Sequence, residues 1–369
     1  MSFRHSQSLA SLRKGRAAFT LVEVLVSMTI LIILLLVSAQ VIGTVQSTWT
    51  KSNARVSQFR EARIAFDIIT RNLSQATLNS YVDYDNSYLS DSVNTVSNTA
   101  PQNYLRKSDL RFVCGPAEGI LQQGASAANS PGHAVFFQAP LGVAHDPSYV
   151  GLDRLLCGRG YFVQYTSDEF FRPEILPPGI PRFRYRLMEF SPPAEKNLIY
   201  PAAAAAPTGA NTSIAWYEQA GVEMDTNATT INQNLTRPIA DNIVALIVAP
   251  QVEVPGAGAG NQFQSVFNYD SAVDTEASPT KQGNQHRLPS LVKVILIAID
   301  EGSADRLSQN SSPESPPFDT LISQALEGQD AAQNLNDTMT KVANIMADRR
   351  VNYRIFSATV SMRGAKWGS

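Results

Sequence analysis

One carboxylate stands apart because of its surroundings. Glu23 is the only charged residue in an apolar run that extends from Phe19 to Val37. A carboxylate near the start of such a run is costly in lipid, so it needs a partner or a task. Glu23 is therefore the first candidate functional residue of the chain.

A second set of residues has the types that bind metals or act as nucleophiles. Cys114, His133, His145 and Cys157 follow one another at spacings of 19, 12 and 12 residues. Structural zinc sites usually bring their ligands in close pairs, and the sequence holds no Cys-x-x-Cys or His-x₃-His. The same spacing disfavours a Cys/His nucleophilic pair. We expect no metal and no cofactor.

Other catalytic signatures are missing from the sequence. It contains no Gly-x-Ser-x-Gly, phosphate loop or dinucleotide fingerprint. Asp83–Ser87 has the alternating oxygen ligands of a calcium loop but lacks its glycine and glutamate, so we expect a solvated turn. The acidic pairs Asp168-Glu169 and Asp300-Glu301 are likewise expected to be solvated turns. An enzyme is not expected.

The apolar run has the length of a membrane span. As a helix, Phe19–Val37 would cover about 28 Å, close to the thickness of the hydrocarbon core. The preceding leader has no acidic residue and carries Arg4, Arg13, Lys14 and Arg16. A basic flank of this kind stays in the cytoplasm and places the rest of the chain outside it. Two alternatives are an ordinary signal anchor and a signal peptide cut near Val37-Ser38-Ala39.

This orientation decides the expected state of the thiols. The bulk of the chain would lie in an oxidising compartment, where Cys114 and Cys157 could form a disulfide. Two buried free thiols are the alternative.

The segment Ala17-Ala18-Phe19-Thr20-Leu21-Val22-Glu23, behind its basic leader, resembles the type IV prepilin signal of pilins and type II secretion pseudopilins. The resemblance implies that a prepilin peptidase cuts between Ala18 and Phe19 and methylates the new amine of Phe19. It also implies that Glu23, fifth in the mature chain, is the assembly carboxylate. Ala18 stands where the family usually has glycine, which bears on the efficiency of cleavage.

The resemblance also implies partners and a location. The partners would be the prepilin peptidase, other pilin or pseudopilin subunits, an inner-membrane assembly platform, and membrane lipid before assembly. The chain would be a single-pass protein of the bacterial inner membrane, with a cytoplasmic N terminus and a periplasmic head. The formal charge falls from −2 to −6 without the leader's four basic residues, so no nucleic acid is expected.

The expected fold class is α+β, a long N-terminal helix packed on a largely antiparallel sheet. The expected parts are a leader (1–18), a membrane and assembly helix (19–38), an amphipathic continuation (39–80) and a β-rich head (81–369). The continuation has apolar positions at steps of three, four and seven: Val45, Trp49, Val56, Phe59, Phe66, Ile69, Leu73 and Ala76. Tyr81–Gln102 is expected to be an exposed loop.

Short β-like runs fill the head. The expected strands are Leu110–Cys114, Ala134–Gln138, Tyr161–Thr166, Arg182–Phe190, Ile239–Val248, Leu291–Ile299 and Tyr353–Met362. The alternation within Arg182–Leu187 predicts one buried and one solvated face. Two helices are expected near the end, Thr320–Glu327 capped by Asp319 and Thr338–Ala347 capped by Asp337.

The arrangement is similar to the large minor pseudopilins of the J type. The C-terminal Tyr353–Val360 and Ala365-Lys366-Trp367 also resemble the prepilin-type family called Verru_Chthon cassette protein C. These resemblances imply a minor pseudopilin of an envelope filament, of the type II secretion or type IV pilus kind. The alternative is a pilus-tip adhesin or a minor pilin that binds DNA or polysaccharide.

Overall fold

The chain divides into two units, residues 1–54 and residues 55–369, and we call the second unit the head. The structure is a computed structural model. It describes residues 20–84, 104–121, 129–144, 146–149, 155–172, 175, 181–196, 199, 216–217, 220, 235–253, 263–273, 283–309, 315–328 and 330–367.

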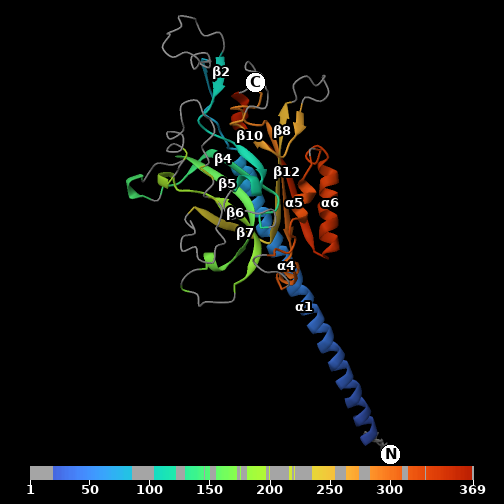
Figure 1. The fold of residues 1–369 in the computed structure, drawn as a ribbon. Coiled ribbons are helices and arrows are strands. Elements are labelled where there is room, and N and C mark those ends of the chain that lie inside the picture. Colours follow the sequence, from blue (N-terminus) through green and yellow to red (C-terminus); the bar gives the residue numbers. More distant parts are fainter. Residues whose placement is uncertain are drawn as a thin grey trace, which may run out of the picture. The chain divides into compact units, whose positions relative to one another are not determined.

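The first element is α1 (Leu21–Leu73), a helix of 53 residues (Figure 1). Within the first unit, the stretch Leu21–Thr50 is apolar and long enough to cross a membrane, and none of it is buried. At 1.5 Å per residue these 30 residues measure about 45 Å, more than a bilayer core requires. The long apolar N-terminal helix predicted from the sequence is confirmed.

The part of α1 that belongs to the head is amphipathic. Ala62, Ala65, Phe66, Ile69 and Leu73 are at most 7% exposed, and their spacing of three and four residues places them on one face. This agrees with the predicted stripe from Phe59 onward, since Phe59 is partly buried against the same core. The predicted stripe also included two residues of the first unit, Val45 and Trp49. Both of these side chains are exposed.

The described strands of the head form three antiparallel sheets with two, six and four strands. The two-stranded sheet pairs β1 (Tyr81–Tyr84) with β2 (Tyr104–Lys107). The six-stranded sheet has the order β10-β3-β4-β5-β6-β7, with bounds Tyr269–Asp270, Val113–Pro116, His133–Gly142, Leu155–Ser167, Phe183–Phe190 and Thr236–Asp241. The four-stranded sheet has the order β12-β11-β8-β9, with bounds Tyr353–Ser361, Leu291–Ile299, Ile243–Glu253 and Phe263–Ser265.

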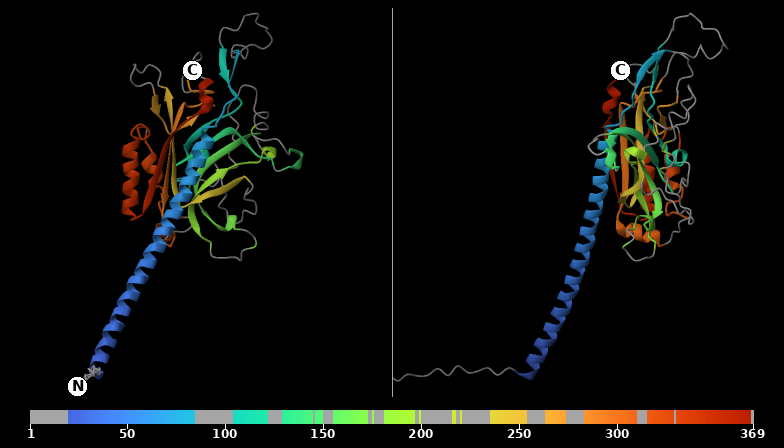
Figure 2. Two further views of the ribbon diagram at one scale, coloured as in Figure 1. Left: turned by 180° about the vertical axis from the view of Figure 1, so that it is seen from behind. Right: turned by 90° about the vertical axis from the view of Figure 1, so that its left-hand side faces the viewer.

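The helices after α1 are short. They are α2 (Ala117–Ile120), α4 (Glu301–Ser308), α5 (Leu321–Leu326) and α6 (Leu335–Asp348). The 3₁₀ turns are η2 (Pro147–Tyr149), η3 (Glu169–Phe171), η4 (Ala194–Lys196) and η6 (Arg363–Trp367). Figures 1 and 2 show α5 and α6 side by side on one face of the four-stranded sheet.

The six-stranded sheet is buried on both faces because its strands alternate between two cores. Val135, Tyr161 and Tyr165 point to the main core, which also contains the buried face of α1 and the four-stranded sheet. Phe136 and Phe162 point to a second core on the opposite face, together with Trp216 and Tyr217. These aromatic residues are therefore part of the core and not an exposed platform for a ligand.

The fold class is α+β, as predicted, but there are three corrections to the elements. The predicted strand Ile239–Val248 is two strands, because Asn242 adopts a left-handed conformation (φ 60°) where the chain passes from β7 to β8 and so from one sheet to the other. The predicted loop Tyr81–Gln102 begins with β1. The predicted turn at Asp300-Glu301 is the start of α4.

The predicted helix caps are also wrong. The N-cap of α5 is Thr320, and the preceding Asp319 has a left-handed φ of 46°. The N-cap of α6 is Asn334, so that Asp337 lies in the first turn. Gly328 follows α5 with a φ of 115°, a conformation that favours glycine.

Candidate functional site: the start of the N-terminal helix

The apolar helix begins with a side-chain cap. The backbone amide of Glu23 donates to Thr20 Oγ1 at 3.3 Å and to the Thr20 carbonyl at 3.0 Å. Thr20 is thus the N-cap, and Glu23 is the third residue of the first turn, the position of the acidic residue in a capping box. Its carboxylate lies at the positive end of the helix dipole, where a negative charge is stabilised.

Several hydroxyl groups of the span are satisfied within the helix. Ser27 Oγ donates to the carbonyl oxygens of Glu23 and Val24, at 2.8 and 3.0 Å. Thr29 Oγ1 donates to the Val26 carbonyl at 2.8 Å, and Thr44 bonds back to Gln40 in the same way. Hydroxyls paired in this way are tolerated in hydrocarbon. Glu23, as the only charged residue of the span, is therefore the group with the greatest need of an external partner.

The structure locates part of the predicted processing site. Glu23 is described and exposed, whereas Ala18 and Phe19 lie outside the described residues. The residue that our sequence reasoning missed is Thr20. Its signal, Thr-x-x-Glu ahead of an apolar run, is visible in the sequence as a capping box.

The predicted disulfide between Cys114 and Cys157 is not formed: both residues are free, buried thiols. Cys114 lies on β3 and Cys157 on β5, with β4 between them. Two strand spacings amount to about 9.6 Å, which exceeds the Cα separation of about 7 Å that a disulfide allows. Burial raises the pKa of both thiols, so neither is prepared to act as a nucleophile.

The scattered metal-ligand types are not gathered either. His133 is buried at the start of β4, and its Nδ1 lies 3.0 Å from both the amide nitrogen and the carbonyl oxygen of Val248. Its ring packs against Phe267, with centroids 4.5 Å apart. His145 lies outside the described residues. Among the residues that the structure describes, no three His, Cys, Asp or Glu side chains are grouped as metal ligands.

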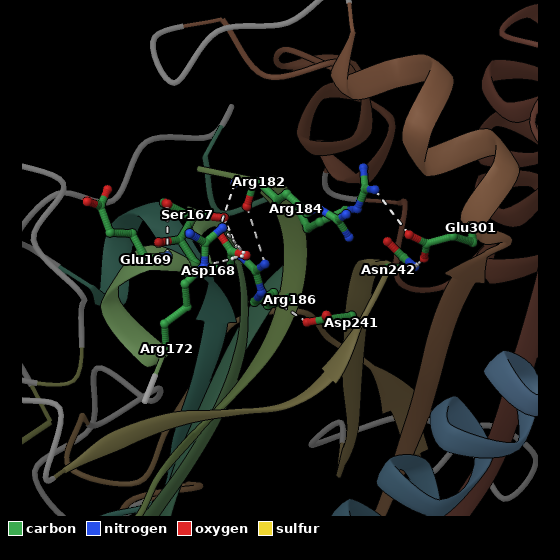
Figure 3. Close-up of polar contacts among 11 residues, drawn as sticks. Ser167, Asp168, Glu169, Arg172, Arg182, Arg184, Arg186, Asp241, Asn242 and Glu301 are labelled. Atoms are coloured by element: carbon green, nitrogen blue, oxygen red, sulfur yellow. Dashed lines mark hydrogen bonds and ion pairs between the residues drawn. The ribbon is translucent and has the colours of Figure 1, made fainter. Parts of the chain in front are cut away.

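Among the residues that the structure describes, an ionic network of the head centres on two arginines of β6 (Figure 3). Arg184 donates to Ser308 Oγ at 3.0 Å and to Glu301 Oε1 at 3.1 Å, and it also pairs with Asp305. Arg186 donates to Asp241 Oδ1 at 2.9 Å.

These arginines overturn the prediction that this face of the strand is solvated. Arg184 and Arg186 are 7% and 3% exposed, although each pairs with carboxylates that are about half exposed. The two predicted acidic pairs lie at opposite ends of the network, Asp168-Glu169 at one end and Glu301 at the other (Figure 3). Asp168 pairs with Arg172 at 2.9 Å, and buried Asp300 caps α4 by accepting from the Ser303 amide at 2.8 Å. These contacts fasten α4 and the β7–β8 junction to the sheet, which is a structural role.

Comparison with known proteins identifies the N terminus. Residues 13–39 match the family model described as the prokaryotic N-terminal methylation motif. No curated protein and no solved structure matches the chain. The match covers the end of the basic leader, the predicted cleavage site, Glu23 and the start of α1. Together with the apolar helix, it supports a place in the class of type IV pilins and pseudopilins, whose members are structural subunits.

Within that class, two further statements follow from the match. A chain with this motif is processed by a prepilin peptidase and assembles with other pilin subunits. The exposed apolar stretch Leu21–Thr50 is consistent with anchoring in the inner membrane before assembly.

Proposed function

We propose that the protein is a minor pseudopilin-like subunit of an envelope filament, of the type II secretion or type IV pilus kind. The observation that carries the proposal is the juxtaposition of the methylation motif with a capped helix whose apolar stretch, Leu21–Thr50, has Glu23 as its only charge. The peptidase cuts between Ala18 and Phe19, Phe19 is methylated, and the head lies in the periplasm. An assembly platform of the inner membrane then moves the helix from lipid into the filament.

Glu23 has a specific task in this proposal. In the filament its carboxylate pairs with a terminal amine, either its own or that of a neighbouring subunit. An unpaired charge buried in an apolar filament core costs several kcal/mol. Correct axial register between subunits is therefore favoured over a shifted one.

The deciding experiment compares the protein expressed with and without a prepilin peptidase. Intact mass and N-terminal sequencing should show a peptidase-dependent start at N-methylated Phe19. Glu23→Ala should then be cut normally but excluded from filaments, whereas Glu23→Asp should retain part of the incorporation. An uncut chain, or a cut after Ala39, would overturn the proposal.

One observation favours the alternative, a pilus-tip subunit that binds a surface ligand. The cross-strand pair Tyr84 and Tyr104 is 47% and 66% exposed, and its ring centroids lie 5.2 Å apart on the ribbon of β1 and β2. Exposed aromatic pairs can stack on a ligand. Tyr84→Ala with Tyr104→Ala should abolish adhesion without affecting filament assembly if this alternative holds. Unchanged adhesion would exclude it.

A further inference from the structure

The head contains a cavity of about 420 Å³ at the surface, between α4, the turn that precedes α5, and the end of α6. This volume lies in the range of small-molecule sites. Its walls combine apolar residues with charged ones: Arg306, Leu307, Ser315, Pro316, Pro317, Asp319 and Arg349.

Backbone carbonyls hold both arginines of the cavity. Arg306 Nη2 donates to the Arg350 carbonyl at 2.7 Å and to Ser303 Oγ at 3.2 Å. Arg349 Nη1 donates to the Pro317 carbonyl at 2.8 Å. Each guanidinium has five N–H donors, so these bonds orient it and leave others for a ligand.

Arg306 and Arg349 differ in their partners from the arginines of the ionic network described above. Arg172, Arg184 and Arg186 each pair with a carboxylate of the head. Within the described part of the chain, no carboxylate lies within ion-pairing distance of Arg306 or Arg349. Arginine forks bind carboxylates and phosphates in preference to other groups, so this cavity has the chemistry of an anion site.

The other polar residues narrow the class of anion. Asp319 reduces the formal charge of the lining from +2 to +1, which matches a single negative charge better than a doubly charged phosphate. Asp319 and Ser315 can also bond to ligand hydroxyls. Leu307, Pro316 and Pro317 supply apolar wall against which a saturated ring can rest.

We propose that this cavity binds a monoanionic, hydroxylated carboxylate of the sugar-acid class. Arg306 and Arg349 bind the carboxylate, and Asp319 and Ser315 bind the hydroxyls. This site is separate from the N-terminal helix, so the proposal stands or falls independently of filament assembly.

The test is isothermal titration calorimetry of the full-length protein in detergent with sodium glucuronate. Glucose, acetate and inorganic phosphate are the comparison ligands. Glucuronate should bind, acetate should bind about tenfold more weakly because it lacks hydroxyls, and glucose should give no heat. Absence of glucuronate binding, equal binding of glucose, or tighter binding of phosphate would overturn the proposal.

Three variants localise the binding. Arg306→Lys with Arg349→Lys keeps the charge but removes both forks, and it should weaken glucuronate binding about tenfold or more. Lys341→Ala removes an exposed charge from α6 outside the cavity and should leave binding unchanged. Asp319→Asn should strengthen the binding of phosphate several-fold, a gain that misfolding cannot produce. Wild-type affinities in the double variant, or no gain in Asp319→Asn, would contradict the assignment.

Discussion

The backbone amide of Glu23 lies 3.3 Å from Thr20 Oγ1, so the residue that starts α1 also fixes the only charge of its apolar stretch. A helix that begins with this cap has one fewer unsatisfied N–H group at its N terminus. The carboxylate of Glu23 is held in the first turn, next to the predicted new terminus at Phe19. Under the proposed function, capping and assembly therefore depend on the same two residues.

This relationship predicts the effect of removing the cap. Thr20→Val has nearly the same shape but no acceptor, and it should destabilise the helix start by about 1 kcal/mol. Because a frayed first turn no longer positions Glu23, we expect several-fold less processed subunit in purified filaments. Thr20→Ser keeps the acceptor and is the matched control. The measurement is the ratio of filament-bound to total processed protein, and equal ratios for Val and wild type would rule out the coupling.

The buried imidazole of His133 predicts a loss of stability in acid. Burial lowers the pKa of His133 from 6.5 to about 4. The unfolded chain therefore gains a proton as the pH falls below about 6.5, whereas the folded chain does not until about pH 4. The contribution of His133 to stability is complete above pH 6.5 and is lost progressively down to pH 4. The loss amounts to about 3 kcal/mol.

Denaturant unfolding at pH 7 and pH 4.5 checks this prediction. His133→Asn does not titrate in this range but can still bond to Val248, so it should lose less stability than the wild type between the two pH values. His286→Asn is the matched comparison variant. Burial also lowers the pKa of His286, although His286 is less enclosed than His133. An equal loss in His133→Asn and wild type would show that other groups dominate the acid response.

The elements that could be predicted from the sequence are those with an unambiguous local pattern. Leu291–Ile299 is β11 with the predicted bounds, because its β-branched and apolar residues, interrupted only by Lys293, strongly favour a strand. The long N-terminal helix follows from an apolar run without proline. The motif around Glu23 was visible for the same reason, since all its parts are adjacent in the sequence.

The errors concern residues whose partners are distant in the sequence. Arg184 and Arg186 alternate with aromatic residues as a solvated face would, but α4 and β7 supply the carboxylates that allow their burial. The sequence alone could not show that Cys114 and Cys157 are too far apart for a disulfide. Their distance depends on the order of strands in the sheet, which places β4 between them. The cavity near Arg349 was missed because it is formed by three segments that no motif connects.

The ion pairs of Arg184 predict an asymmetric response to mutation. Glu301→Gln with Asp305→Asn leaves the buried guanidinium without a charge partner, and it should destabilise the head by about 3–5 kcal/mol. Arg184→Met removes the buried charge and leaves two carboxylates that are about half exposed, which should cost less than about 1.5 kcal/mol. Thermal unfolding of the two variants provides the comparison. The reverse order of stabilities would mean that Arg184 acts through packing alone.

Arg350 predicts a stabilising substitution at the end of α6. It has a left-handed φ of 53°, and its amide donates to the Ala347 carbonyl at 2.9 Å, while the Val351 amide donates to the Met346 carbonyl at 2.9 Å. These two bonds form a Schellman motif with arginine at the position that usually holds glycine.

A left-handed conformation costs a non-glycine residue roughly 1–2 kcal/mol, which exceeds the added entropy cost of glycine in the unfolded chain. Arg350→Gly should therefore stabilise the head by about 0.5–1 kcal/mol. Arg350→Ala removes the same side chain but keeps the strain, so it should give no gain. Urea unfolding monitored by near-ultraviolet circular dichroism checks both variants, and a gain in Arg350→Ala equal to that in Arg350→Gly would assign the effect to the lost charge instead of the backbone.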